Sequence, residues 1–303
     1  PPITQVLDWF RNVQLNHIWG STNRYTRPLE NLPEYGGDIG VRNANAILRL
    51  MINTPGPQYD SALIFCLQGG IDNYHIMIQE GEPWPRVGGG EEVGHKILIT
   101  FFAALLGNEE VKNNVKNTLL YEDLFVAYYS DSISLWGNHG WGIAYPSPVS
   151  YWDNQSTGSS SRSVADPYGY IDGGQRPGAF YQGCCTTQPF KGTVTALLLM
   201  PALRKIWYPQ ALIDYIDRWV YFGIWTQPDP CAAFDGNVEN EGLTWGPDPN
   251  NPSDCIKNGI GRFPELHGTD RDGGLRKSAF QTAMWNAYRR SAEGANTKPP
   301  FGA

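Results

Sequence analysis

Segments in which apolar residues recur every three or four positions follow one another along this chain. Such spacing places the apolar side chains on one face of an α-helix. The segment from Asp38 to Asn53 begins on an aspartate suited to capping a helix, and the segment from Pro57 to Gly81 follows a Thr-Pro-Gly-Pro breaker. We expect these two segments to form an antiparallel helical hairpin.

Further periodic segments follow along the chain. Gly94 to Leu119 is typical of a second hairpin, with a break at its Gly-Asn pair, and Lys191 to Trp225 of a third, whose second helix begins near Pro209. We expect a last helix from Gly274 to Arg290. Strict alternation of apolar and polar residues is rare, and only Leu124 to Trp136 is ambiguous. The sequence therefore predicts a mainly α fold, and stacked hairpins can close into a toroid or extend as a solenoid.

Composition excludes several classes of protein. No run of apolar residues is long enough to span a bilayer, so we expect no membrane segment. The net charge of −7 and the absence of long Lys/Arg runs argue against a protein that binds nucleic acid through its phosphates.

The chain opens with Pro-Pro and no initiator Met, from which we expect that a signal peptide or upstream segment has been removed.

Cysteine usage favours an exported protein. None of the five cysteines forms a CxxC pair, which excludes a zinc ribbon or a thioredoxin-like motif. Cys231 and Cys255 bracket a loop rich in Pro, Asn and Gly and could close it as a disulfide. Asn154 begins an Asn-Gln-Ser triplet that could accept a glycan. We expect a secreted or periplasmic protein.

Two long segments without helical periodicity, Gly137 to Gly192 and Thr226 to Gly273, are candidates for function because such lengths are unusual in a compact domain. Many of the 11 Trp and 16 Tyr residues lie beside Gly, Pro, Asn or Asp in loops. These aromatic rings either fill gaps between helices or offer flat faces on which sugar rings stack. The first segment also gathers a set of polar side chains: Asn138, His139, Tyr145, Arg162, Tyr168, Tyr170, Asp172, Arg176 and Tyr181.

These residue types suit removal of the C5 proton of a uronic acid and expulsion of the sugar linked at C4. Proton loss beside a carboxylate adds negative charge, so the site must first neutralise that carboxylate with Arg, Asn or His donors. Tyr or His then takes the proton, and Tyr can return a proton to the leaving oxygen. Two more histidines lie on or beside helices: we expect His75 to lie in the core or to support the site from behind, and His95 either to face the cleft or to lie away from it.

Four stretches of sequence carry a family resemblance: GGGEEVGHKILITFFAALLG, DPYGYIDGG, YQGCCTTQPFKGTVTALLLMPALRKIWYPQALIDYIDRW and SAFQTAMWNAYR. Together they resemble (α/α)-toroid polysaccharide lyases, most closely the glucuronan and alginate lyases with an (α/α)7 barrel. The resemblance covers roughly Ile39 to Arg290. It implies a single catalytic toroid over residues 1–303, and because fewer hairpins are recognisable than a closed toroid needs, further helices in the long segments or before residue 1.

The resemblance also implies roles for single residues. Asn138 and His139 would neutralise the carboxylate or assist proton transfer, Arg162 would hold the carboxylate, and Tyr168 would act as base or acid, with Tyr170 and Tyr181 as rivals. Further contacts to an acidic polysaccharide are expected from the following residues: Trp136, Trp141, Tyr170, Arg176, Tyr181 and His95. A positive groove could form from the basic residues Arg162, Arg176, Lys191, Arg204 and Lys205, although the chain as a whole is acidic. We expect no metal and no cofactor.

Two other functions remain open. An inverting glycoside hydrolase on the same helical fold would need a carboxylic acid and a carboxylate base placed on opposite sides of the scissile bond. The available carboxyls are Asp166, Asp172, Asp229, Asp235 and Glu241, and no motif places any of them. A carbohydrate-binding module without catalytic activity would explain the aromatic loops but not the cluster of Arg, His and Tyr.

Overall fold

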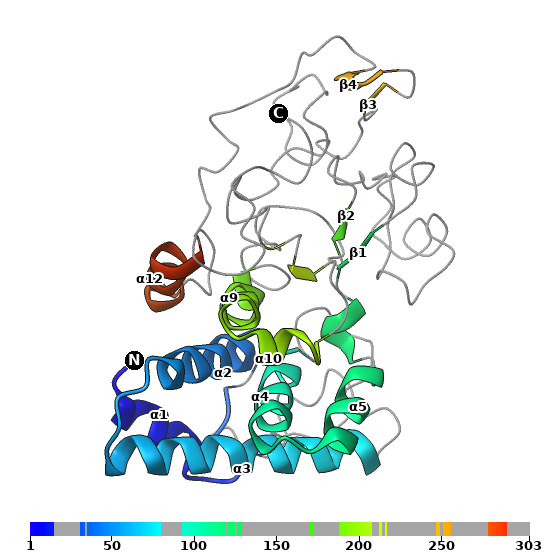
Figure 1. Ribbon diagram of the computed structural model, residues 1–303. Helices are drawn as coiled ribbons and strands as arrows, with labels where there is room; N and C mark the ends of the chain where they lie inside the picture. Colours follow the sequence, from blue (N-terminus) through cyan, green and yellow to red (C-terminus); the bar gives the residue numbers. More distant parts are fainter. Residues whose placement is uncertain are drawn as a thin grey trace. The chain divides into compact units, whose positions relative to one another are not determined.

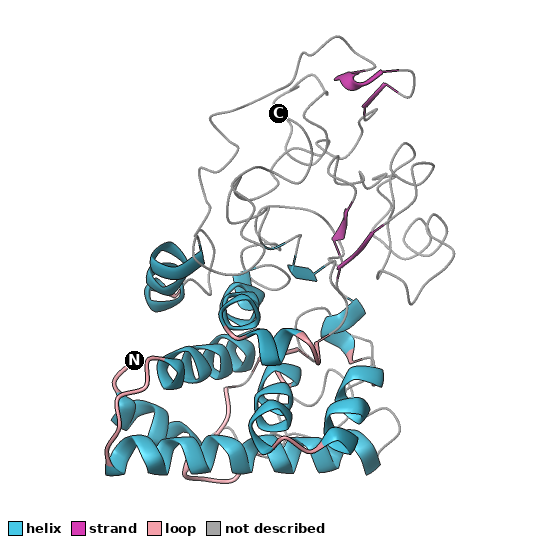
Figure 2. Ribbon diagram, in the orientation of Figure 1, coloured by secondary structure: helices cyan, strands magenta, loops and turns pink. Residues whose placement is uncertain are grey.

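The computed structural model describes the following residues: 1–14, 31–33, 35–79, 93–118, 120–124, 126–128, 170–172, 188–207, 212, 213, 216, 247, 248, 251–255 and 278–289. This part of the chain is mainly helical (Figures 1 and 2). The mainly α class predicted from periodicity is therefore confirmed for it. None of its helices is long and apolar enough to cross a membrane.

The helices are α1 (Ile3–Phe10), α2 (Gly36–Met51), α3 (Pro57–Gln79), α4 (Lys96–Leu106), α5 (Glu109–Asn117), α9 (Lys191–Leu199), α10 (Pro201–Arg204) and α12 (Ala279–Tyr288). Two 3₁₀ turns, η3 (Tyr121–Leu124) and η6 (Gln188–Phe190), and four short strands, β1 (Val126–Tyr128), β2 (Tyr170–Asp172), β3 (Pro247–Asp248) and β4 (Asn251–Cys255), complete the described elements.

The chain divides into two compact units. Unit 1 consists of Pro1–Asp123, Pro189–Tyr208 and Ser278–Ala295. Unit 2 consists of Leu124–Gln188, Pro209–Lys277 and Asn296–Ala303. Each unit thus combines stretches that lie far apart in the sequence, and unit 1 contains all the helices named above.

Helix α4 is the centre of unit 1. It contacts α2, α3, α5 and α10, and its residues from Lys96 to Ala103 are all buried. Helix α3 runs along the lower edge of Figure 1 and packs against both α1 and α4, while α2 packs against α9. A helix that is apolar on most sides needs such cover from several neighbours, so the mainly apolar sequence of α4 explains its central place.

Glycines allow the closest approaches between these elements. A Cβ on Gly70 of α3 would lie 2.5 Å from the Cβ of Phe102 on α4, closer than real contacts allow. Gly94, just before α4, has φ +98°, and a Cβ there would lie 2.6 Å from the Cα of Gly40 on α2. Helices α3 and α4, and the start of α4 and α2, can therefore pack this tightly only because side chains are absent at these points.

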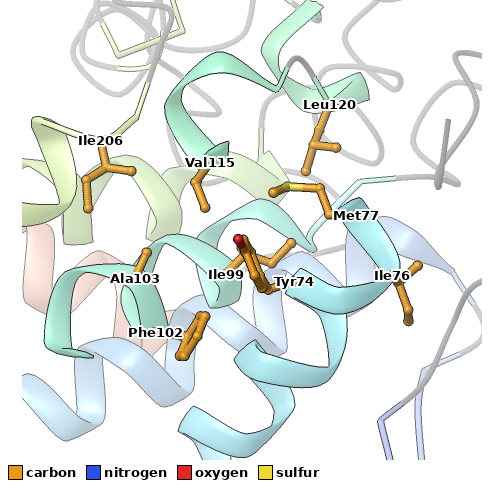
Figure 3. Packing of buried hydrophobic residues seen from close by; sticks show 9 residues of the cluster. All are labelled: Tyr74, Ile76, Met77, Ile99, Phe102, Ala103, Val115, Leu120 and Ile206. Carbon is orange, nitrogen blue, oxygen red and sulfur yellow. The ribbon is translucent and has the colours of Figure 1, made fainter. Parts of the chain in front are cut away.

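A cluster of buried apolar side chains joins α3, α4 and α5 with Leu120, just before η3, and Ile206, just after α10 (Figure 3). Its members are Tyr74, Ile76, Met77, Ile99, Phe102, Ala103, Val115, Leu120 and Ile206. Residues so far apart in sequence meet here because each helix contributes one apolar face. Tyr74 keeps its hydroxyl satisfied by accepting a hydrogen bond from Nδ2 of Asn114 over 2.8 Å.

Most of the predicted helix boundaries agree with the structure. The expected helices beginning at Asp38 and Pro57 are α2 and α3, which contact each other. The predicted break in the second hairpin lies between α4 and α5, where Gly107 adopts φ 68° and the Asn108 side chain accepts hydrogen bonds from the amides of Glu110 and Val111. Left-handed Gly and a capping Asn are the usual signals for the end of one helix and the start of the next.

The expected continuous helix from Lys191 is wrong, because α9 ends at Leu199 and α10 begins at Pro201. Met200 between them is extended, with φ −123° and ψ 94°. Proline lacks an amide hydrogen, and its ring disfavours a helical conformation at the residue before it. Pro201 therefore ends α9 and starts a new helix, α10. The helix expected to begin near Pro209 lies outside the described residues, apart from residues 212, 213 and 216.

The ambiguous segment from Leu124 to Trp136 contains a strand. Strand β1 pairs antiparallel with β2, with Val126 opposite Asp172, Ala127 opposite Ile171 and Tyr128 opposite Tyr170. A second antiparallel pair joins β3 and β4 within the segment that was expected to lack regular structure. Both pairs belong to unit 2.

Candidate functional site

The four residues predicted to be catalytic and most of those predicted to hold the substrate lie outside the described residues. These are Trp136, Asn138, His139, Trp141, Arg162, Tyr168, Arg176 and Tyr181. Cys231 of the expected disulfide also lies outside them. Of the residues expected to hold substrate, Tyr170 and His95 are described, the first in unit 2 and the second in unit 1.

Strand pairing brings together the two ends of the segment that holds the predicted catalytic residues. Tyr128 is the last residue of β1, Tyr170 is the first residue of β2, and the two are opposite one another. Paired residues of antiparallel strands have Cα atoms about 4.5–5.5 Å apart. The chain between them, which includes Asn138, His139, Arg162 and Tyr168, therefore starts and ends at neighbouring positions of this strand pair.

The two histidines beside helices have opposite exposures. His95 is 2% exposed and occupies the N-cap position of α4, and its burial does not favour the expected contact with a substrate. His75 on α3 is exposed, so it does not lie in the core, which was one of the two places expected for it; support of the site from behind stays a prediction. Helix α3 turns Tyr74 and Met77 inward, which leaves the intervening His75 on the outer face, where its ring lies edge-on to that of Tyr74 at 5.6 Å.

Lys191, which was expected to line a positive groove, is buried. Lys191 is 0% exposed, and its Nζ donates a hydrogen bond to Oγ1 of Thr282 on α12 over 2.9 Å. An ammonium held between α9 and α12 cannot line an open groove. Lys205 is exposed and Arg204 is partly exposed, so these two basic side chains remain accessible at the end of α10.

An unexpected group of charged side chains lies buried at the start of α4. Nζ of Lys96 is 2.5 Å from Oδ2 of Asp123, and both side chains are 0% exposed. The same Asp123 oxygen accepts a hydrogen bond from the amide of Leu120 over 2.8 Å, and Lys96 also donates to the carbonyl of Thr118 over 3.3 Å. The ammonium lies 5.3 Å from the ring centroid of Trp207, a favourable cation–π distance.

Glu122 completes this group, which we call the Lys96 cluster (Lys96, Glu122 and Asp123). Its Oε1 accepts a hydrogen bond from the backbone amide of Lys96 over 2.5 Å, and the residue is 1% exposed. Burial raises the pKa of Glu122 to about 8, against the amides of Lys96 and Gly94, which lower it. Burial likewise raises the pKa of Asp123 to about 6, with Lys96 opposing the shift.

The Lys96 cluster cannot act directly on a polymer, because all three side chains are buried. Its hydrogen bonds instead tie η3 to the N-terminus of α4. Neither composition nor spacing indicated this group: Lys96 was part of a helix pattern, and Glu122 and Asp123 preceded the ambiguous segment. Neighbouring carboxyls after a helix are ordinarily solvated, so only the tertiary contacts identify it.

Unit 1 also has an open, mainly apolar pocket of about 580 Å³, a volume in the range of small-molecule sites. It lies where the ends of several helices meet: Leu50, Met51, Ile52, Asn53, Tyr59, Leu63, Phe101, Leu105, Leu199, Met200, Met284 and Tyr288 line it. The hydroxyl of Tyr59 is occupied by its hydrogen bond to the carbonyl of Leu50 over 2.8 Å. The pocket therefore offers few polar groups for orienting a sugar.

Within the described ranges, no three His, Cys, Asp or Glu side chains are grouped so that they could hold a metal ion. Comparison of the chain with protein-family models, with curated proteins and with solved structures found no match.

Proposed function

We propose that the chain is a polysaccharide lyase of the (α/α)-toroid type that cleaves a uronic-acid-containing polysaccharide, of the glucuronan or alginate kind, by β-elimination. The mainly helical unit 1, with α4 enclosed by neighbouring helices, is compatible with one part of a toroid. The four motifs of the resemblance support the family, and two of them lie largely on α4 and α12.

The observation that carries the proposal is the pairing of β1 with β2. It supports a common site because the residues of the predicted catalytic set from Asn138 to Tyr168 lie on a single stretch whose two ends meet at Tyr128 and Tyr170. A closed stretch samples far less space than an open one of equal length. Convergence of an Asn, a His, an Arg and a Tyr on one sugar ring is correspondingly easier to achieve.

The proposed reaction begins with neutralisation of the uronate carboxylate by Arg162, Asn138 and His139. This neutralisation makes the C5 proton more acidic, and Tyr168 or His139 takes it. The electron pair left at C5 forms the C4–C5 double bond as the bond from C4 to the glycosidic oxygen breaks. A proton, returned by Tyr168, ends on the leaving oxygen, so one chain gains an unsaturated end and the other a new reducing end.

Trp136, Trp141, Tyr170, Arg176 and Tyr181 would hold neighbouring sugars by stacking and charge. The buried His95 is not part of the proposed substrate contacts. The proposed partner is an acidic polysaccharide, rather than nucleic acid or a membrane, and the proposed location is outside the cytoplasm. Each proton transfer is assigned to a side chain of this protein, and the proposal includes no metal or cofactor.

Ultraviolet absorbance and reducing ends, followed together on a panel of polyuronates and neutral glycans, test the reaction. Elimination produces both signals in equal amounts, because each cleavage makes one conjugated double bond and one reducing end. Reducing ends without absorbance would mean hydrolysis and would direct attention to Asp229 and the other carboxyls. Silence on every polymer would contradict the proposal and favour a binding role.

Replacement of Tyr168 by Phe tests the assignment of the base. We expect Y168F to lower turnover by about 10²–10⁴-fold, the usual contribution of one acid–base group, with unchanged helical circular dichroism. The matched control is Y288F, which removes a hydroxyl from a residue that is 45% exposed on α12. Full activity in Y168F would remove Tyr168 from the mechanism, and Tyr170 and Tyr181 would be tested next.

A further inference from the structure

The Lys96 cluster contains more negative than positive groups. Glu122 and Asp123 are each 1% exposed, and the one cation of the cluster is Lys96, whose Nζ contacts Asp123. Among the described residues, Oε2 of Glu122 and Oδ1 of Asp123 have no hydrogen-bond partner. An unpaired buried carboxylate is very costly, and the usual response is to take up a proton.

We propose that the Lys96 cluster is a proton-linked lock: the folded chain holds Glu122 protonated at neutral pH, and loss of this proton loosens the tie between η3 and α4. The lock is independent of the proposed lyase activity. It concerns the end of the first stretch of unit 1, Pro1–Asp123, after which the chain passes at Leu124 into unit 2.

The geometry explains why the proton belongs to Glu122. Asp123 has the ammonium of Lys96 at 2.5 Å and the amide of Leu120 at 2.8 Å, so its negative charge is compensated. Glu122 has the backbone amide of Lys96 but no cation at such a distance among the described side chains. The charged groups that act on Glu122 are Asp123, which disfavours ionisation, and Lys96, which favours it.

Among the described residues, Lys96 is the one cation that acts on Glu122. His95, at the N-cap of α4, is buried and directly precedes Lys96, while Trp207, after α10, presents an uncharged ring to the ammonium. Ionisation of Glu122 would therefore put a second negative charge beside Asp123. Lys96 alone would then have to compensate both carboxylates. Exposure of η3 to water would hydrate them and weaken their repulsion.

The direction of the pH effect follows from the raised pKa. Burial raises the pKa of Glu122 to about 8 from its ordinary 4.5, so between these pH values the folded chain binds more protons than the unfolded chain. The free energy of unfolding therefore falls as pH rises through this window. This direction is opposite to that of a carboxylate stabilised by an ion pair, whose contribution is lost on acidification.

The test compares wild type, Glu122→Gln and the control Glu110→Gln from pH 5 to pH 9. Gln keeps an oxygen to accept from the Lys96 amide and cannot ionise, whereas Glu110 is exposed in the first turn of α5. We expect the unfolding equilibrium constant of wild type, relative to that of E122Q, to rise by at least about tenfold over this range. E110Q should follow wild type, and parallel profiles for wild type and E122Q would overturn the lock.

Amide hydrogen exchange reports the local event. The amides of Lys96 and Leu120 donate to Glu122 and Asp123, so above pH 8 they should exchange faster in wild type than in E122Q at the same pH. Equal rates would contradict loosening of η3.

Should E122Q fail to fold, infrared spectroscopy of wild type decides the matter. The carbonyl stretch of a protonated carboxyl should be present at pH 7 and disappear as pH rises past about 8. Absence of this band at pH 7 would overturn the proposal.

Discussion

Gly69 and Gly70 are neighbours on α3, yet the two positions have different surroundings. A Cβ on Gly70 would lie 2.5 Å from the Cβ of Phe102 and 2.9 Å from the carbonyl oxygen of Leu98. A Cβ on Gly69 would meet its nearest atoms, in Leu98 and Phe10, at an ordinary 3.4 Å. Backbone and Cβ atoms cannot turn aside as a side-chain end can, so only Gly70 is sterically required.

We therefore expect opposite effects from the same substitution. Gly70→Ala should lower the free energy of unfolding by about 1–3 kcal/mol, the range for overpacking. Gly69→Ala should leave it unchanged or raise it by up to about 1 kcal/mol, because Ala favours the helix. Urea unfolding followed by circular dichroism measures both, and a G70A variant as stable as G69A would show that α3 and α4 can separate at little cost.

Among single residues, the sequence was least informative about the burial of polar side chains. The exposure of His75 and the burial of His95 depend on which face of α3 and which end of α4 meet other elements. Lys96 and Asp123 are far apart in the chain, and no spacing rule relates a lysine at a helix start to carboxyls in a later turn. Such pairs are decided by tertiary packing.

Among the helices and strands, the sequence predicted best those boundaries that are set by a local residue such as Gly, Asn or Pro. Gly107 and Asn108 marked the break between α4 and α5 correctly, and Pro201 carried a signal for the end of α9 that the predicted continuous helix ignored. Helix α1 was not predicted, although Ile3, Val6, Leu7 and Phe10 have helical spacing. The partners β1 and β2 lie far apart in sequence, and pairing over such a distance leaves no local pattern.

Asn108 caps the N-terminus of α5 with its side chain. Oδ1 of Asn108 accepts from the amides of Glu110 and Val111 at 2.9 and 3.2 Å. Asn108→Ala removes both bonds and should cost about 1 kcal/mol, which would lower the melting temperature by about 2–4 °C. Asn108→Ser, which keeps an oxygen acceptor, should recover most of the loss; a variant N108A that melts like wild type would mean that α5 frays without affecting its contact with α4.

Across the whole molecule, unit 1 is assembled from three separate stretches of chain. This organisation could not be predicted from the sequence, because periodicity shows which face of a helix is apolar but not which helix covers it. The expectation of one domain over residues 1–303 was based on the resemblance alone. Helix α12, for example, packs on residues that come much earlier in the sequence: Nε2 of its Gln281 donates a hydrogen bond to the carbonyl of Val41 on α2 over 3.2 Å.

The contribution of α12 to unit 1 can be measured by truncation. Met284 and Trp285 are 5% and 7% exposed, and a Cβ on Gly192 of α9 would meet the side chain of Gln281 at 2.4 Å. Loss of one large buried side chain costs about 2–5 kcal/mol, and the whole free energy of unfolding of a native protein is only about 5–15 kcal/mol.

A chain ending at residue 277 should therefore lose cooperative unfolding and much of its helical signal. A chain ending at residue 295 keeps all of unit 1 and should retain both. If the shorter chain still unfolded cooperatively with full helical content, α12 would be a peripheral addition, and α1 to α5 with α9 and α10 would be enough to form the core of unit 1.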